Sequence, residues 1–294
     1  MLRALGIGEV FVWMAQPELF FLCLLRGLNI EEGLAVPENE RHMLIGLLFM
    51  LSFTPLRRVL LDWVRSQEGE REALSGFIKV SHLRVVALML LNEGDAPTAT
   101  RVAEQGVAAA RALRDDHAVL IVLLQLQMAL GSIEDYPQML RVSEELEQLA
   151  MRVQNQRYVA IGLLGQGMVW MRYGELERAT VVLRRANENI PPEFGLMPLA
   201  MALGQSALCA FLRGELADAI AIADEAMRQS EQIKWAMPPV MHVFATALEV
   251  YLSVPDSHRH RANIERALGR LEGIARLFPI ARPRAFFYRA RFEW

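Results

Sequence analysis

Hydrophobic positions along this chain recur at the three- and four-residue spacing of helices, and strand-like alternation is nowhere sustained. The segment YVAIGLLGQGMVWMR, residues 158–172, is apolar on nearly every side, as in a helix buried by several neighbours. The segment ELERATVVLRRANENI, which follows Gly174, is amphipathic. Its apolar or small side chains share one helical face: Leu176, Ala179, Thr180, Leu183 and Ala186. The pattern therefore predicts an all-α protein.

One stretch of this pattern is repeated. The segment MRYGELERATVVLRRA, 171–186, matches FLRGELADAIAIADEA, 211–226, forty residues later. Gly94 lies two such periods before Gly174, and a rewritten turn falls near Glu134. The Pro, Asp and Ser of LSVPDSHRH mark a turn one period after Gly214. A period of about 40 residues is in the range of two-helix repeats, so we predict units of helix, tight turn, helix and loop.

Small residues occupy fixed offsets from the turn glycines. Ala87, Gly167 and Ala207 lie seven residues before them, Ala99, Ala179 and Ala219 five after, and Gly106, Ala186 and Ala226 twelve after. Antiparallel helices that pack about 8–10 Å apart need small side chains at their crossings. Glycine at the turn itself, as at Gly94, Gly174 and Gly214, adopts a positive φ at little cost and ends the first helix.

These positions carry a family resemblance. Gly167, Trp170, Gly174, Ala179, Leu183, Ala186 and Pro191 resemble the tetratricopeptide-repeat consensus, and the units around Gly214 and Gly94 resemble it in part. The resemblance implies a right-handed α-solenoid of two-helix repeats. The period of about 40 exceeds the usual ~34, and we expect longer loops to account for the difference. We expect one continuous solenoid with divergent apolar repeats at 1–70, core repeats at 71–235 and basic C-terminal repeats at 236–294.

A wider resemblance covers LLRGLNIEEGL, FLRGELADAIAIADEA and IERALGRLEGIARLFPIARPRAFFYRARFEW, in that order. The set is similar to the helical-repeat region that follows a signalling ATPase module in large bacterial proteins with a nucleotide cyclase or protein kinase domain. It implies a regulatory role, with such a module of the same or a neighbouring chain as partner. The helix expected to begin at Arg282 has no second helix after it. We therefore expect either that the sequence is a fragment of a longer protein or that an aromatic face of this helix docks on another molecule (Phe286, Phe287, Tyr288, Phe292, Trp294).

Composition narrows the class further. The 294 residues carry a net charge of −3, which does not favour nucleic acid as a partner. The longest uncharged stretch near the N-terminus, Met43 to Leu56, is shorter than the ~18–20 residues of a membrane span, so we expect buried helices there. Cys23 and Cys209 lie in apolar runs and are expected as buried thiols in a reducing, cytoplasmic compartment.

Motifs of catalysis are missing from the sequence. It contains no phosphate-binding Gly-x-x-x-x-Gly-Lys-Ser/Thr loop, no His-Glu-x-x-His and no Gly-x-Ser-x-Gly elbow. His258 and His260 with Asp256 could hold a metal, but the neighbouring arginines would repel it. Asp115, Asp116 and His117 are expected in a solvated loop between helices. We therefore predict no catalytic residues, no cofactor and no metal.

Binding candidates come from the repeat itself. Gln166 and Gln205, each after a glycine, stand at matching points of two successive first helices, which line the concave surface of repeat solenoids, and Trp170 lies nearby. These glutamines are expected either to hydrogen-bond an extended peptide or to be satisfied by a neighbouring helix.

The C-terminal residues 258–294 hold nine Arg and three Glu, 9 − 3 = +6. Arg282, Arg284, Arg289 and Arg291 could bind an acidic surface or form a solvated helix face. The predicted function is a non-enzymatic protein- or peptide-binding scaffold in bacterial signalling. The alternative is a small-molecule effector sensor lined by methionine-rich helices.

Overall fold

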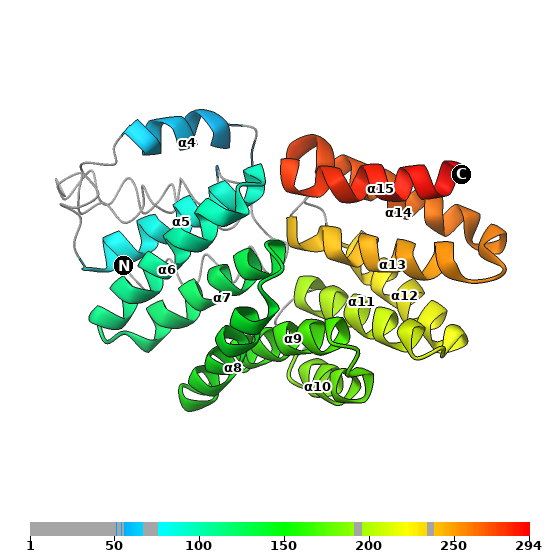
Figure 1. The fold of residues 1–294 in the computed structure, drawn as a ribbon, viewed down its shortest axis with the longest axis horizontal. Helices are drawn as coiled ribbons and strands as arrows, with labels where there is room; N and C mark the ends of the chain where they lie inside the picture. Colours follow the sequence, from blue (N-terminus) through cyan, green and yellow to red (C-terminus); the bar gives the residue numbers. More distant parts are fainter. Residues whose placement is uncertain (1–50, 52–53, 55, 67–75, 191–195, 234–237) are drawn as a thin grey trace. The chain divides into compact units, whose positions relative to one another are not determined.

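The structure is a computed structural model that describes residues 51, 54, 56–66, 76–190, 196–233 and 238–294. Over these residues it contains helices and turns but no strand (Figure 1). The helices are α4 Arg57–Ser66, α5 Gly76–Glu93, α6 Ala96–Ala112, α7 Asp116–Ser132, α8 Tyr136–Arg152, α9 Gln156–Arg172, α10 Leu176–Glu188, α11 Leu196–Leu212, α12 Leu216–Glu231, η4 Pro238–Val240, α13 Met241–Ser253, η5 Ser257–His260, α14 Arg261–Leu277, η6 Pro279–Ala281 and α15 Arg282–Glu293. The predicted all-α fold of paired helices is confirmed.

The helices follow a strict register. Those from α5 to α12 begin at residues 76, 96, 116, 136, 156, 176, 196 and 216, one every 20 residues. Two helices therefore make the predicted 40-residue unit, including the unit whose turn at Glu134 is rewritten. The expectation of longer loops holds for only some connections. The helices α6, α7, α8, α9 and α11 are 17 residues long, and the connections between α6 and α10 have three residues each, so there the extra length lies in the helices. Seven residues join α10 to α11, and six join α12 to η4.

The short connections between α5 and α10, and between α11 and α12, share one backbone conformation. Gly94, Gly174 and Gly214 have φ of 89°, 78° and 81°, and Arg114, Glu134 and Gln154 adopt the same left-handed region at 53°, 61° and 56°. After every one of these residues except Arg114, the next amide donates to a carbonyl five residues back, as in Asp95 N to Leu90 O at 2.9 Å and Glu175 N to Trp170 O at 3.0 Å. This closes the last helical turn as a Schellman motif does.

An acidic or amide residue follows the left-handed one and begins the next helix. The side chains of Asp95, Asp115, Asp135 and Asn155 accept a hydrogen bond from a backbone N–H in the first turn. Asp115, expected in a solvated loop, instead caps α7, and His117 lies in the first turn of that helix.

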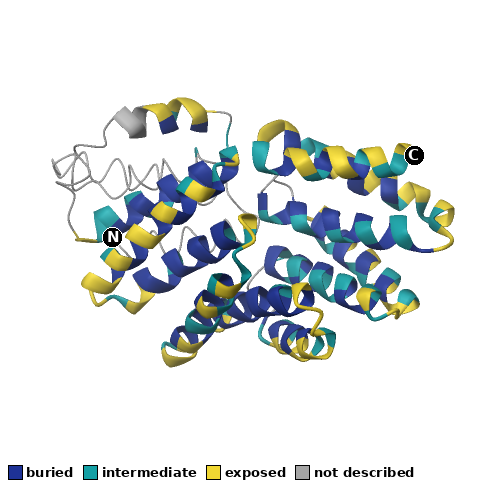
Figure 2. Ribbon diagram, viewed as in Figure 1, coloured by how far each residue is buried: buried dark blue, intermediate teal, exposed yellow. Residues whose placement is uncertain are grey.

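Small residues lie where helices cross. The predicted packing alanines are all at most 2% exposed: Ala87, Ala99, Ala179, Ala186, Ala207, Ala219 and Ala226. Figure 2 draws buried positions such as these in dark blue along the helices. A Cβ added to Gly167 would lie 2.5 Å from Leu183 Cδ2, and one added to Gly106 would lie 2.8 Å from Val122 Cγ1. The paired helices therefore approach too closely for a larger side chain at these points.

The chain divides into two compact units, Met1–Gln138 and Met139–Trp294. In the second unit the first helices α9, α11, α13 and α15 contact one another in that order. The second helices α10, α12 and α14 pack against them. The expected boundaries at 70/71 and 235/236 do not coincide with the division and stay predictions.

Some expectations fall on residues the structure does not describe. Most of the apolar N-terminal segment, Cys23 and the Pro191–Pro192 pair lie outside the described residues. Across the described ranges, no helix combines the length and the apolar character needed to cross a bilayer.

Candidate functional site

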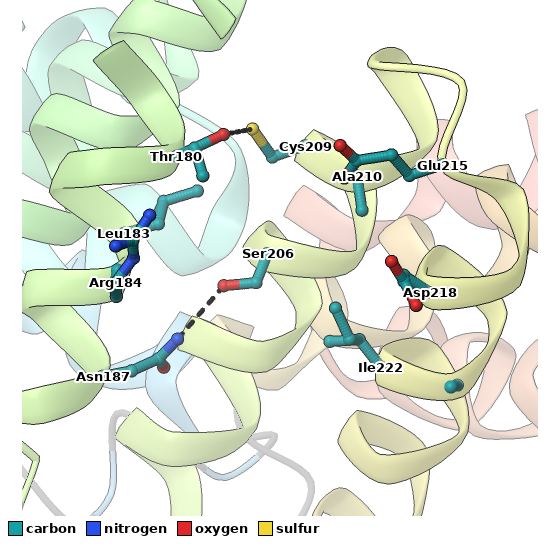
Figure 3. A pocket seen from close by; sticks show the side chains of 11 residues that line it. Thr180, Leu183, Arg184, Asn187, Ser206, Cys209, Ala210, Glu215, Asp218 and Ile222 are labelled. Atoms are coloured by element: carbon teal, nitrogen blue, oxygen red, sulfur yellow. Dashed lines mark hydrogen bonds between the residues drawn. The ribbon is translucent and has the colours of Figure 1, made fainter. Parts of the chain in front are cut away.

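A groove of about 310 Å³ opens between α10 and α12, with α11 as its floor (Figure 3). Thr180, Leu183, Arg184 and Asn187 line it from α10, Ser206, Cys209 and Ala210 from α11, and Glu215, Asp218, Ala221 and Ile222 from the start of α12. It lies between two second helices, whereas the concave first-helix surface was the predicted binding surface. The groove has depth because the side chains of α11 that line it are short, above all that of Ala210.

Hydrogen bonds between α10 and α11 fix the floor of the groove. Asn187 Nδ2 donates to Ser206 Oγ at 3.2 Å, and the Thr180 hydroxyl lies 3.5 Å from Cys209 Sγ (Figure 3). Arg213 donates to Thr180 Oγ1 at 2.9 Å. Burial raises the pKa of the Cys209 thiol and outweighs the opposing effects of the Thr180 hydrogen bond and the Arg213 charge. The thiol is therefore protonated at neutral pH and has little nucleophilic character.

The rim of the groove carries charge that the fold does not neutralise. Arg184 on α10 and Asp218 on α12 are exposed on opposite sides (Figure 3). Neither forms a salt bridge or a hydrogen bond with any described residue. Glu215, by contrast, pairs with Arg213 NH2 at 2.8 Å. The groove thus offers one free guanidinium and one free carboxylate above an apolar floor.

Two of the predicted binding residues are used inside the fold. Gln166 is buried and its Nε2 donates to Glu147 Oε2 at 2.6 Å, while Arg185 NH2 donates to Glu147 Oε1 at 2.8 Å. Trp170 is 9% exposed and lies beneath the Arg178 guanidinium, whose Cζ is 3.5 Å from the ring centroid. These contacts correspond to the structural alternative, a glutamine satisfied by a neighbouring helix.

Gln205 occupies a different environment. It is half-buried on α11, and its Oε1 accepts no hydrogen bond from the described residues. It shares a partly exposed face with Met201, Leu208 and Leu212. Gln166 lies eight residues before its turn glycine and Gln205 nine, and one residue rotates a side chain by ~100° about a helix. The two glutamines are therefore not equivalent, although they look so in sequence.

The predicted basic patch is largely paired within the second unit. Arg289 bonds Glu272 at 2.7 Å, and Arg291 bonds Glu249 at 2.7 Å. Arg282 Nε donates to the Ala275 carbonyl at 3.3 Å, and Arg284 contacts Met241 Sδ at 3.7 Å. The aromatic residues of the same helix differ: Phe286 and Phe287 are 72% and 55% exposed, whereas the hydroxyl of buried Tyr288 bonds Glu249.

Metal-binding side chains do not gather in the part of the chain that is described, where no group of three His, Cys, Asp or Glu could hold an ion. Asp256, which was considered with His258 and His260, pairs with Arg259 at 3.2 Å.

Sequence reasoning missed Arg184, Ala210 and Asp218. A comparison of residues 40 positions apart could have found them, because Ala210 stands where the preceding repeat has Trp170.

Comparison with known proteins identifies the fold. No protein-family model and no curated protein matches the chain. Among solved structures, Rap protein complexed with competence and sporulation factor is similar over 99% of this chain and 79% of that one, with a TM-score of 0.69 and 10% identity. BtubC (BKLC) from P. vanneervenii is similar over 74% of this chain and 92% of that one, with a TM-score of 0.56 and 16% identity. The chain thus has a fold of tetratricopeptide-like two-helix repeats.

Proposed function

We propose that this chain is a non-enzymatic repeat scaffold that binds a protein or peptide segment. The observation that carries the proposal is the groove between α10 and α12, which combines an apolar floor with the unpaired charges of Arg184 and Asp218. Repeat folds hold such grooves rigid because each helix pair is fixed by its neighbours. A segment that lays one apolar side chain on Ala210 and Ile222 would bury apolar surface and satisfy both charges.

The structural neighbours support the same class of function. The Rap structure similar to this chain was solved in complex with competence and sporulation factor, so a chain of this fold can hold another molecule. The resemblance of FLRGELADAIAIADEA and of the C-terminal segment to repeats beside signalling ATPases supports a regulatory role in bacterial signalling. An ATPase, nucleotide cyclase or kinase module of the same or a neighbouring chain is then the proposed source of the bound segment, in the cytoplasm.

The test is a selection of peptides from a random display library against the immobilised chain, followed by titration of the selected peptides by calorimetry. We expect peptides that bind and that lose more than about tenfold in affinity to an Ala210→Trp variant, in which the indole fills the groove. Val181→Trp is the matched control, because it adds the same side chain at a 54% exposed position of α10 that does not line the groove. A library that yields no specific binder would refute the proposal.

The groove's size also favours the second candidate, a small-molecule effector module. Its volume of about 310 Å³ lies at the lower end of the ~300–1,000 Å³ that ligand pockets span. A thermal-shift screen of metabolites separates the two functions. Stabilisation by a small molecule, abolished in Ala210→Trp but kept in Val181→Trp, would replace the peptide proposal.

A further inference from the structure

The groove has counterparts one repeat earlier and one repeat later in the second unit. Helices α9 (Gln156–Arg172) and α11 (Leu196–Leu212) are offset by 40 residues, as are the starts of α8, α10 and α12. Each lining residue can therefore be compared with the residue 40 positions before it. Ala210 corresponds to Trp170, Ser206 to Gln166 and Asp218 to Arg178.

In the earlier repeat the same position is closed by the chain's own side chains. Trp170 is only 9% exposed, and the Arg178 guanidinium covers its ring at 3.5 Å. Gln166 bonds Glu147 at 2.6 Å, and Arg185 bonds the other oxygen of that carboxylate at 2.8 Å. An aromatic ring, a stacked cation and a polar bridge thus complete the packing.

In the later repeat the chain again supplies its own contacts. Asp224, the counterpart of Arg184, accepts hydrogen bonds from Tyr251 Oη at 2.6 Å and from Asn263 Nδ2 at 2.9 Å. These bonds join α12 to α13 and α14. In the groove between α10 and α12, by contrast, Ala210 replaces the indole, and Arg184 and Asp218 bond no described residue.

We propose that the groove between α10 and α12 takes an aromatic side chain from a partner segment that also carries Arg or Lys beside it. The aromatic ring would occupy over Ala210 the space that Trp170 fills one repeat earlier. The partner's cation would meet the Asp218 carboxylate and lie against the ring, as Arg178 does on Trp170. Arg184 on the opposite wall repels a second cation, so the basic residue is directed toward α12. This inference rests on the proposed function and specifies its ligand.

The first test uses synthetic peptides and the full chain. A set of fluorescein-labelled dodecapeptides in a Gly/Ser background carries one Trp and one Arg separated by zero to four residues, and binding is measured by fluorescence anisotropy. For the best spacing, we expect the Trp→Ala twin to bind at least about tenfold more weakly. The Arg→Gln twin should bind about two- to fivefold more weakly, since the pair with Asp218 is exposed.

A double-mutant cycle locates the cation. In an Asp218→Asn variant, the preference for the Arg peptide over the Gln peptide should shrink to the part that stacking on the ring supplies, while the Trp→Ala loss persists. Glu177→Gln is the matched control: it removes a carboxylate from α10, on the opposite side of the groove, whose side chain is 85% exposed and does not line the groove. In that variant the Arg preference should remain.

A second measurement does not depend on any peptide. The double variant Ala210→Trp/Asp218→Arg rebuilds the closed packing of the earlier repeat. We expect it to fold, to raise Tm above the wild type and to bind none of the peptides. A lower Tm with native helicity would contradict the proposed correspondence between the groove and the closed position one repeat earlier.

The outcomes separate the two proposals. Peptides that bind without preference for Trp and Arg, or equally well to Ala210→Trp, would overturn this inference and leave the scaffold function standing. A library and a peptide set in which nothing binds would overturn both. Concentration-dependent self-association, lost in Ala210→Trp during analytical ultracentrifugation, would show that a second copy is the occupant and overturn the assignment to a separate partner.

Discussion

The sharpest prediction concerns the crossing of α8 and α9 at Gly162. A Cβ built there lies 2.8 Å from both the Glu147 backbone N and the Ser143 backbone O, and 3.1 Å from Glu147 Cα. Ordinary carbon contacts begin at about 3.4 Å, so Gly162→Ala forces the two helices apart by about 0.6 Å, the difference 3.4 − 2.8. Backbone atoms cannot rotate away as a side chain can, and the strain therefore spreads along the crossing.

The magnitude follows from two opposing effects. Overpacking of this kind costs about 1–3 kcal/mol, and contacts with backbone place this site at the upper end. The better helix propensity of alanine returns about 1 kcal/mol, so the net loss is about 2 kcal/mol. Gly269 in α14 is the matched control, because nothing lies within 4 Å of its added Cβ. Gly269→Ala should therefore gain about 1 kcal/mol from propensity alone.

Thermal unfolding followed by far-ultraviolet circular dichroism measures both variants. At about 2–4 °C per kcal/mol, Gly162→Ala should lower Tm by about 4–8 °C and Gly269→Ala should raise it by about 2–4 °C. Should both substitutions raise Tm by the same amount, the close approach of α8 and α9 would be incorrect.

Three further predictions use unfolding measurements. Gln166→Leu should cost about 1–3 kcal/mol in urea unfolding, because it leaves the buried Glu147 Oε2 without its donor while Arg185 still bonds the other oxygen. Gln205→Leu should be neutral or stabilising, and equal losses would contradict the difference between the two sites. Gly174→Ala should destabilise by about 1 kcal/mol and Glu134→Gly should stabilise by a similar amount, since both residues have positive φ, and opposite signs would argue against these turns. The pKa of His242 is lowered from 6.5 to about 3, mainly by desolvation, so the unfolded chain binds a proton that the folded chain does not. Stability should fall by about 1.4 kcal/mol per pH unit below 6.5, and His242→Gln should remove that part of the slope, as urea titrations between pH 7 and 5 would show.

The sequence revealed the repeat wherever the left-handed residue is glycine, at Gly94, Gly174 and Gly214. It concealed the intervening turns, because Arg114 and Gln154 adopt the same φ without the residue type that marks it. The usable signal was the acidic or amide residue that stands directly before the next helix. Its side chain caps that helix at Asp95, Asp115, Asp135 and Asn155, whereas Glu175 and Glu215 make no such hydrogen bond. Read in that way, the 20-residue spacing and the short loops were both predictable.

The candidate site was less accessible from sequence. Gln166 and Gln205 each follow a glycine, so they look equivalent in sequence. Their distances from the following turn glycine differ by one residue, which places the two side chains ~100° apart around their helices. The groove depends on Ala210 standing where Trp170 stands one repeat earlier. Aligning the repeats shows that exchange, but a small residue in a helix is common. That this alanine opens a groove can be seen only once the positions of α10 and α12 are known, because these helices leave the space above it unfilled.

The fixed spacing of helix starts limits how the length of this chain can change. A single inserted residue inside a helix would turn every following position of that helix by ~100° and set its capping residue out of place. Insertion of one complete 40-residue cassette, for example a second copy of residues 136–175, leaves each junction as it is, with a left-handed residue followed by a capping residue. Gene duplication in units of 40 codons is therefore the route by which such an array can grow or shorten and still fold.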